Sequence, residues 1–111
     1  MRRRRLASGA IAGGRDSRYQ RCMAELPILI DCDPGLDDAV AIALAASTSR
    51  LRIDAITTVA GNAGLAMTTR NGLGIAAALG LGCGVHAGAA QPLVLPLRTS
   101  TDLWGGTGDL G

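Results

Sequence analysis

The chain has 111 residues, 48 % of them hydrophobic, and a formal net charge of +2, so its length suits one small domain. Most of its positive charge lies before Met23, and from there on four arginines face eight acidic residues, a balance of −4. An acidic body argues against a nucleic-acid surface, and no apolar run approaches the ~20 residues that span a bilayer. The three cysteines have no metal-motif spacing, which is typical of a reducing compartment such as the cytoplasm.

Residues 1–22 differ in composition from the rest of the chain. An arginine run, Arg2 to Arg5, is followed by small and weakly apolar residues, and the segment is nearly free of acidic residues. It lacks the strong hydrophobic region of a secretory signal, while an organelle-targeting peptide remains an alternative. We interpret residues 1–22 as a disordered tail or an over-extended start, and residues 23–111 as the domain.

From Met23 onward, strand-like and helix-like segments alternate. The predicted elements are strands over residues 27–33, 51–59 and 85–87 and helices over residues 39–46 and 65–79. The first strand is a continuous apolar run, as expected for a parallel strand covered on both faces. This order predicts an α/β fold, an open and mostly parallel sheet with flanking helices in a Rossmann-like βαβαβ unit, incomplete at the C-terminus. From Arg98 onward we expect a polar, glycine-rich loop.

Four carboxylates gather where the first predicted strand ends: Asp31, Asp33, Asp37 and Asp38. Like charges this close raise one another's pKa unless a cation or hydrogen-bond donors compensate. A hard divalent cation with oxygen ligands is such a compensator. Asp37 and Asp38 would open the following helix, whose N-terminus favours negative charge. Taken alone, either residue could be no more than an N-cap.

A second polar loop follows the second predicted strand. Asn62 comes directly after Gly61, and by itself it could be an ordinary turn residue. The carboxyl ends of consecutive parallel strands share one edge of a sheet, where open α/β sheets bind their ligands. We therefore expect Asn62 and Asp33 at the same edge. Further along, His86 is expected to be a packed structural histidine, and Trp104 either a hydrophobic anchor or a substrate-side lid.

Two other motif families compete for the carboxylate run. An EF-hand loop starting at Asp31 would need Gly at its sixth position and Glu at its twelfth. Those positions hold Leu36 and Ile42, so this motif is rejected. A phosphotransferase of the haloacid-dehalogenase type would use Asp31 as nucleophile and Asp33 as acid/base. That family prefers Thr or Val where this chain has Gly35, and it does not need the later pair of aspartates.

A third pattern fits the chain more closely. Residues 30–39, Ile-Asp-Cys-Asp-Pro-Gly-Leu-Asp-Asp-Ala, resemble the signature of the inosine–uridine-preferring nucleoside hydrolases. Residues 55–62, 68–71 and 87–93 resemble the following blocks of that family, in matching order. The similarity runs from about Pro27 to the C-terminus, which makes it far more specific than a lone pair of aspartates.

The resemblance implies a Ca²⁺-dependent enzyme that hydrolyses the N-glycosidic bond of purine and pyrimidine ribonucleosides to ribose and free base. By position, Asp33 and Asp38 would be Ca²⁺ ligands, and Asp33 would also be the general base that takes a proton from the metal-bound water. Asp37 would hydrogen-bond the ribose hydroxyls, Asn62 would contact the ribose side, and Asp31 would be a supporting residue. The implied partners are a small ribonucleoside substrate and, at full length, further copies of the chain in a homo-oligomer, without nucleic acid or membrane.

Two departures from the family pattern matter. The loop after Thr99 carries Asp102-Leu103-Trp104-Gly105 where the family often has His-x-His-Gly, which leaves the base specificity open. Family members are also much longer, and Asp33 and Asp38 alone cannot supply the roughly six to eight oxygens that Ca²⁺ takes. We therefore expect the N-terminal part of a nucleoside hydrolase, with little or no activity as 111 residues alone. The alternative is a non-catalytic α/β remnant with at most weak cation binding.

Overall fold

The computed structural model describes residues 25–104 and 106–111. The interpretation of residues 1–22, and the domain start at Met23, lie outside the described residues, as does the expectation for the Trp104 side chain. The elements are β1 (Leu26–Cys32), α2 (Leu36–Ser47), β2 (Leu51–Thr58), α3 (Leu65–Ala78), β3 (Gly84–Ala87) and α4 (Ser100–Trp104).

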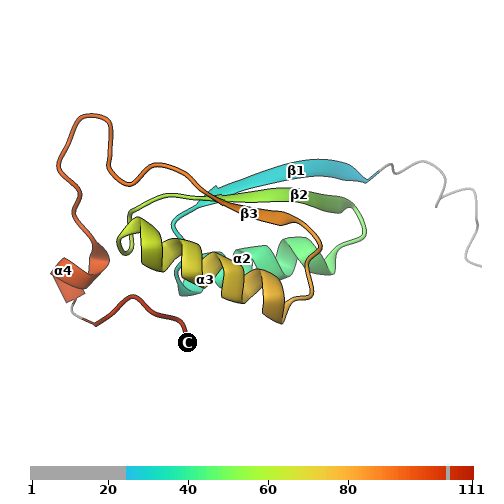
Figure 1. Ribbon diagram of the computed structural model, residues 1–111. Coiled ribbons are helices and arrows are strands. Elements are labelled where there is room, and N and C mark those ends of the chain that lie inside the picture. The colour runs from blue at the N-terminus through green and yellow to red at the C-terminus, as the bar shows by residue number, and fades with distance from the viewer. Residues whose placement is uncertain (1–24, 105) are drawn as a thin grey trace, which may run out of the picture.

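Three parallel strands form one sheet in the order β1-β2-β3. Both long helices, α2 and α3, lie on the same face of this sheet (Figure 1). The carboxyl ends of the strands point toward the end of the molecule that carries α4 (Figure 1). The predicted α/β fold with a parallel βαβαβ order is therefore confirmed.

The ends of β1 and α2 decide where the carboxylates lie. β1 ends at Cys32, so that Asp33 is the first residue beyond the strand. The helix α2 begins at Leu36, and its N-cap is Gly35 rather than Asp37 or Asp38. The N-cap interpretation of the two aspartates is thus wrong, because they lie inside the first turn. There they still favour the helix, since the free N–H groups of that turn attract negative charge.

The core lies between the sheet and the two long helices. Ile42 of α2 and Ile56 of β2 are 1 % and 0 % exposed, and Cys32 packs with them. Within the described residues helices cover one face of the sheet only, because α2 and α3 pack on the same side. Leu29 is consequently 73 % exposed on the other face, which contradicts the expected burial of β1 on both faces.

His86 is exposed, not packed as its apolar neighbours suggested. Successive side chains of a strand point to opposite faces. Val85 packs against the core, so His86 emerges on the face that carries no helix. The apolar stretch does form a strand, but a strand of four residues has too few positions to indicate which face each one takes.

The short helix α4 lies where a loop was expected, at residues 100–104. Thr99 and Asp102 form a reciprocal pair at its start. The backbone N–H of Thr99 donates to Asp102 Oδ2 at 2.9 Å, and the N–H of Asp102 donates to Thr99 Oγ1 at 3.2 Å. These bonds lower the pKa of the Asp102 carboxyl and satisfy two N–H groups of the first turn.

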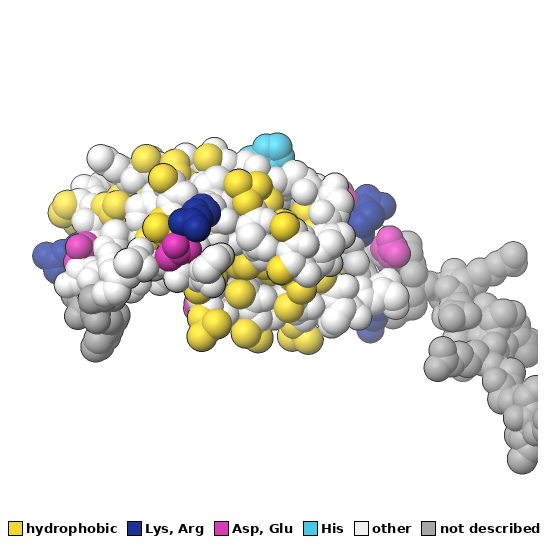
Figure 2. Space-filling view, turned by 60° about the horizontal axis from the view of Figure 1, so that its bottom comes forward, with side chains coloured by type: hydrophobic (Ala, Val, Ile, Leu, Met, Phe, Trp, Pro, Cys, Tyr) yellow, Lys and Arg dark blue, Asp and Glu magenta, His cyan; other side chains and the backbone are white. Residues whose placement is uncertain are grey.

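Several large hydrophobic side chains are exposed on the helix-bearing side. Leu36, Val40 and Leu44 repeat every fourth residue along the outer surface of α2, and hydrophobic side chains spread widely over this view of the molecule (Figure 2). None of the helices in the described residues has both the length and the apolar character needed to cross a membrane.

Candidate functional site

The loops after β1 and β2 meet at the carboxyl edge of the sheet. Two hydrogen bonds join them: the backbone N–H of Asn62 donates to Asp33 Oδ2 at 2.7 Å, and Asn62 Nδ2 donates to the Asp33 carbonyl oxygen at 3.0 Å. The expectation that Asp33 and Asn62 share one edge is confirmed. Asn62 is also more than a local turn residue, because both bonds reach across 29 positions of the chain.

Two glycines make this close approach sterically feasible. A Cβ atom on Gly61 would lie 2.2 Å from Asp33 Oδ2, which no real structure tolerates. A Cβ atom on Gly35 would lie 2.7 Å from Asn62 Nδ2 and 3.1 Å from Asp37 Oδ1. The side chains of Asp37 and Asn62 therefore both approach Gly35. The two residues for which the resemblance implies ribose contacts thus lie near each other.

Negative charge accumulates around Asp38. Its pKa is raised, first by burial and further by the nearby charges of Asp37 and Asp33, while the N–H of Gly35, 3.2 Å from Asp38 Oδ2, opposes the shift. Burial, together with Asp38, Asp31 and Asp33, also raises the pKa of the Cys32 thiol to about 11. A bound cation would offset this charge and favour the ionised carboxylates.

Asp31 is held by a neighbouring strand. Thr57 Oγ1 donates to Asp31 Oδ1 at 2.6 Å, and the two residues are register partners in the β1–β2 pair. Asp31 and Cys32 point to opposite faces. Because Cys32 belongs to the core, Asp31 emerges on the helix-free face.

The donor set at this edge suits a hard cation only in part. Carboxylate oxygens are the ligands that Ca²⁺ prefers, but two carboxylates offer fewer oxygens than its roughly six to eight. In the part of the chain that the structure describes, no group of three or more His, Cys, Asp or Glu side chains is placed to hold a metal. Asp33 and Asp38 could therefore supply only part of the ligand set of a hard cation.

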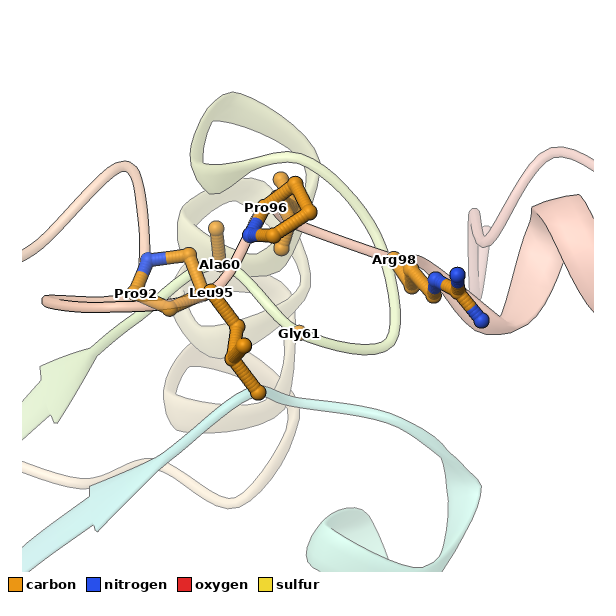
Figure 3. A pocket seen from close by; sticks show the side chains of 7 residues that line it. Ala60, Gly61, Pro92, Leu95, Pro96 and Arg98 are labelled. Carbon is orange, nitrogen blue, oxygen red and sulfur yellow. The ribbon is translucent and has the colours of Figure 1, made fainter.

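A cavity of about 470 Å³ lies at the loop after β2, and none of the four aspartates lines it. Gly61 lines it and also abuts Asp33, and the other lining residues are mostly apolar: Ala60, Pro92, Leu95, Pro96 and Leu97, with Arg98. Arg98 points away from the other labelled side chains (Figure 3). The volume of the cavity falls in the range of small-molecule pockets, roughly 300–1,000 Å³.

Two residues that bind the site loops were not singled out from the sequence. Ser100 donates to the carbonyl oxygen of Asn62 from both its backbone N–H, at 3.0 Å, and its Oγ, at 2.7 Å. Asn71 of α3 is 4 % exposed, and its Nδ2 donates to the carbonyl oxygen of Pro34 at 2.9 Å. The signal for Asn71 in the sequence was its place in residues 68–71, one of the blocks that resemble the family.

Comparison with known proteins identifies the family. The sequence model of the inosine-uridine preferring nucleoside hydrolases matches residues 28–111. The chain is 43 % identical over 83 residues to a non-specific ribonucleoside hydrolase of Klebsiella pneumoniae, covering 75 % of this chain and 27 % of that protein. It is 46 % and 45 % identical over 82 residues to the inosine-uridine preferring nucleoside hydrolases of Crithidia fasciculata and Leishmania major, covering 73 % of this chain and 26 % of each.

The chain therefore belongs to the inosine-uridine preferring nucleoside hydrolase family. It spans about a quarter of the length of the curated relatives it matches.

Proposed function

We propose that this protein hydrolyses the N-glycosidic bond of purine and pyrimidine ribonucleosides, releasing ribose and the free base. The observation that supports this most is the pair of hydrogen bonds between Asn62 and Asp33. These bonds join two residues whose roles the family resemblance implies: Asp33 would deprotonate the attacking water, and Asn62 would contact the ribose. The printed names of the relatives, ribonucleoside and nucleoside hydrolases, support the same reaction class.

In this proposal Asp33 is the general base. Its Oδ2 already accepts the N–H of Asn62, so Oδ1 is the atom that would take a proton from the attacking water. As the nucleobase leaves, C1′ of the ribose becomes positively charged. The ionised carboxylates around Asp33 then stabilise the transition state more than the neutral substrate.

Asp37 and Asn62 would bind the ribose. Asp37 is exposed in the first turn of α2, where its carboxylate can accept hydrogen bonds from sugar hydroxyls. The approach of both side chains to Gly35 supports a shared sugar-binding role. The cavity of about 470 Å³ that Gly61, the residue before Asn62, lines has room for a small ligand.

Ca²⁺ is the cofactor we propose, held by Asp33 and Asp38 together with oxygen ligands from outside this pair. When bound, it would lower the pKa of a water molecule and so make a nucleophile available near neutral pH. Burial raises the pKa of Asp38, and the nearby charges of Asp37 and Asp33 raise it further; a cation there would favour its ionised form. Asp31 would remain a supporting residue, held by Thr57.

A second function class is favoured by one observation. The described residues gather no group of three or more metal-ligating side chains, so a non-catalytic α/β domain with weak cation binding is the alternative.

The homo-oligomeric assembly and the cytoplasmic location remain predictions.

The test compares two samples: the 111-residue chain, and the protein that carries this sequence as isolated from its own cells. Both are stripped with EDTA and assayed for ribose released from inosine and from uridine while Ca²⁺ is added back. We expect calcium-dependent release from the cellular protein, its loss in an Asp33→Asn variant, and little or no release from the 111-residue chain. A cellular protein that releases no ribose at any Ca²⁺ concentration would favour the non-catalytic domain.

A further inference from the structure

The turn between Asp33 and Asp37 packs against helix α3. Pro34, in the middle of this turn, is fully buried. A Cβ atom on Gly72 would lie 3.1 Å from Thr58 Cγ2 and 3.3 Å from Val85 Cγ1, so Gly72 lets α3 approach the sheet closely, and it lies next to the Pro34 ring, 3.5 Å from the same Cβ position. The neighbouring Asn71 then donates its Nδ2 to the Pro34 carbonyl oxygen at 2.9 Å.

Asn71 also binds the last residues of the chain. Its Nδ2 donates a second hydrogen bond to the Gly108 carbonyl oxygen at 2.7 Å, and its Oδ1 accepts the N–H of Leu110 at 3.2 Å. Both amide protons and the amide oxygen are therefore engaged, although only 4 % of the residue is exposed. A buried amide with all these partners has one orientation, because turning it would leave buried polar groups unpaired.

From this geometry we infer that Asn71 is a positioning residue for the carboxylate turn: by binding the Pro34 carbonyl, it sets the direction in which Asp33 and Gly35 leave the turn. Asp33 then meets the N–H of Asn62, and the N–H of Gly35 meets Asp38 Oδ2. Asn71 touches none of the four clustered carboxylates in the hydrogen bonds described. It acts through the backbone on either side of Pro34.

The bonds to Gly108 and Leu110 have a second consequence. They connect the turn that carries Asp33 to the segment that follows α4. Displacing that segment would free the Asn71 amide, so the order of residues 108–110 and the placement of Asp33 are coupled. The coupling involves the turn at Pro34, helix α3, residues 108–110 and the side chain of Asn71.

The test uses Asn71→Ala in the full 111-residue chain, because Ala favours the helix and adds no buried charge. Arg70→Gln is the matched control. Arg70 is the preceding residue of α3, and it also binds the C-terminal segment, through Asp109 Oδ2 at 3.0 Å, but has no hydrogen bond to the turn.

The first measurement is amide hydrogen exchange, which needs no calcium. We expect the N–H groups of Gly35 and Asn62 to exchange roughly tenfold faster in Asn71→Ala, and to change much less in Arg70→Gln, which keeps all three Asn71 hydrogen bonds. The reference is the Leu81 N–H, which is bonded to the Ala76 carbonyl oxygen at 2.9 Å beyond the other end of α3. Equal acceleration at Leu81, or none at Gly35 and Asn62, would overturn the positioning role.

The second measurement is Ca²⁺ affinity, and here alone the inference rests on the proposed function. Residues that orient metal ligands typically change metal affinity by ~10–100-fold when replaced, and we expect a loss of that size in folded Asn71→Ala. Unchanged affinity in a folded variant would count against the positioning role. A wild-type chain that binds no Ca²⁺, with local acceleration still seen at Gly35 and Asn62, would instead support the positioning role and reject a calcium site formed by this chain alone.

A second variant covers the case in which Asn71→Ala does not fold. Removing residues 108–111 deletes two of the three partners of Asn71 from the end of the chain without altering α3. We expect the same two amides to exchange faster than in the intact chain, by a smaller factor than for Asn71→Ala. Unaltered exchange at Gly35 and Asn62 in this shortened chain would contradict the coupling between the two segments.

Discussion

Asp33 Oδ2 lies 2.7 Å from the backbone N–H of Asn62, and this contact joins the loops that follow β1 and β2. A main-chain donor orients the carboxylate without occupying its second oxygen. The same carboxylate presses against the backbone of Gly61. The geometry of the proposed base therefore depends on the loop after β2 as much as on its own strand.

Gly61→Ala is expected to displace Asp33. The new Cβ would lie 2.2 Å from Asp33 Oδ2 and 2.8 Å from its Cγ, so the carboxylate must leave its place beside Asn62. We predict a loss of Ca²⁺ affinity of ~10–100-fold, measured by calorimetry. Gly82→Ala is the control, since a Cβ atom there meets nothing within 4 Å; an equal loss in both variants would show that the steric explanation is wrong.

The raised pKa of Asp38 predicts how stability depends on pH without calcium. A raised pKa means that the folded state favours the protonated carboxyl, so this stabilisation is present below the usual carboxyl pKa and is lost as the pH rises through the raised value. Asp38→Asn removes the titration and should melt at a higher temperature than the wild type near pH 7. Thermal melting from about pH 3 to 7 measures the difference; a gap that does not widen with pH would contradict the assigned shift.

Saturating Ca²⁺ should reverse that order. The cation favours the ionised form of Asp38, so the wild-type chain gains stability from Ca²⁺ by mass action while Asp38→Asn gains less. Melting curves with and without Ca²⁺ at neutral pH test this directly. Equal gains in the two proteins would remove Asp38 from the proposed ligand set.

Stability should depend strongly on the small aliphatic core. Ile56 is completely buried, and Ile56→Ala is expected to lower the free energy of unfolding by about 2–5 kcal/mol, a large part of the total for a small domain. Leu44→Ala is the control, because Leu44 is 71 % exposed on α2. Urea denaturation followed by circular dichroism compares the two variants, and similar midpoints would place the core elsewhere.

Cys32 should react slowly with alkylating reagents. Its thiol is buried beside three carboxylates, and its pKa of about 11 leaves little thiolate near neutral pH. Cys83, which is only partly buried, should be labelled by iodoacetamide at pH 8 before Cys32. Peptide mass spectrometry over time distinguishes the two sites, and faster labelling of Cys32 would mean that the β1 end opens readily.

Much of the fold could be predicted from the sequence because its signals are local. The continuous apolar run before Asp33, the alanine-rich segment after it and the β-branched second strand each indicate one element. The meeting of Asp33 and Asn62 then followed from the rule that parallel strands end at one edge. The spacing of Thr99 and Asp102 matches a capping box, which predicts the start of a helix, although the glycines that follow α4 favour a loop.

The remaining features depend on long-range placement. Asn71 could not be assigned a role because two of its partners, Gly108 and Leu110, return to α3 from 37 and 39 positions away. The exposure of Leu29 depends on α2 and α3 choosing the same face of the sheet, which an apolar strand does not indicate. The raised pKa of Asp38 likewise needed its burial to be known.

The most direct test of the central claim is a calorimetric Ca²⁺ titration of the chain beside its Asp33→Asn and Asp31→Asn variants. Each variant replaces one carboxylate by an amide, and only Cys32 separates Asp31, which lies in β1, from Asp33, the first residue after it. The account predicts that the wild-type chain and Asp31→Asn bind Ca²⁺ with similar affinity, whereas Asp33→Asn binds at least ~10-fold more weakly. No binding by the protein that carries this sequence as isolated from its own cells, or an equal loss in both variants, would contradict a calcium site built on Asp33.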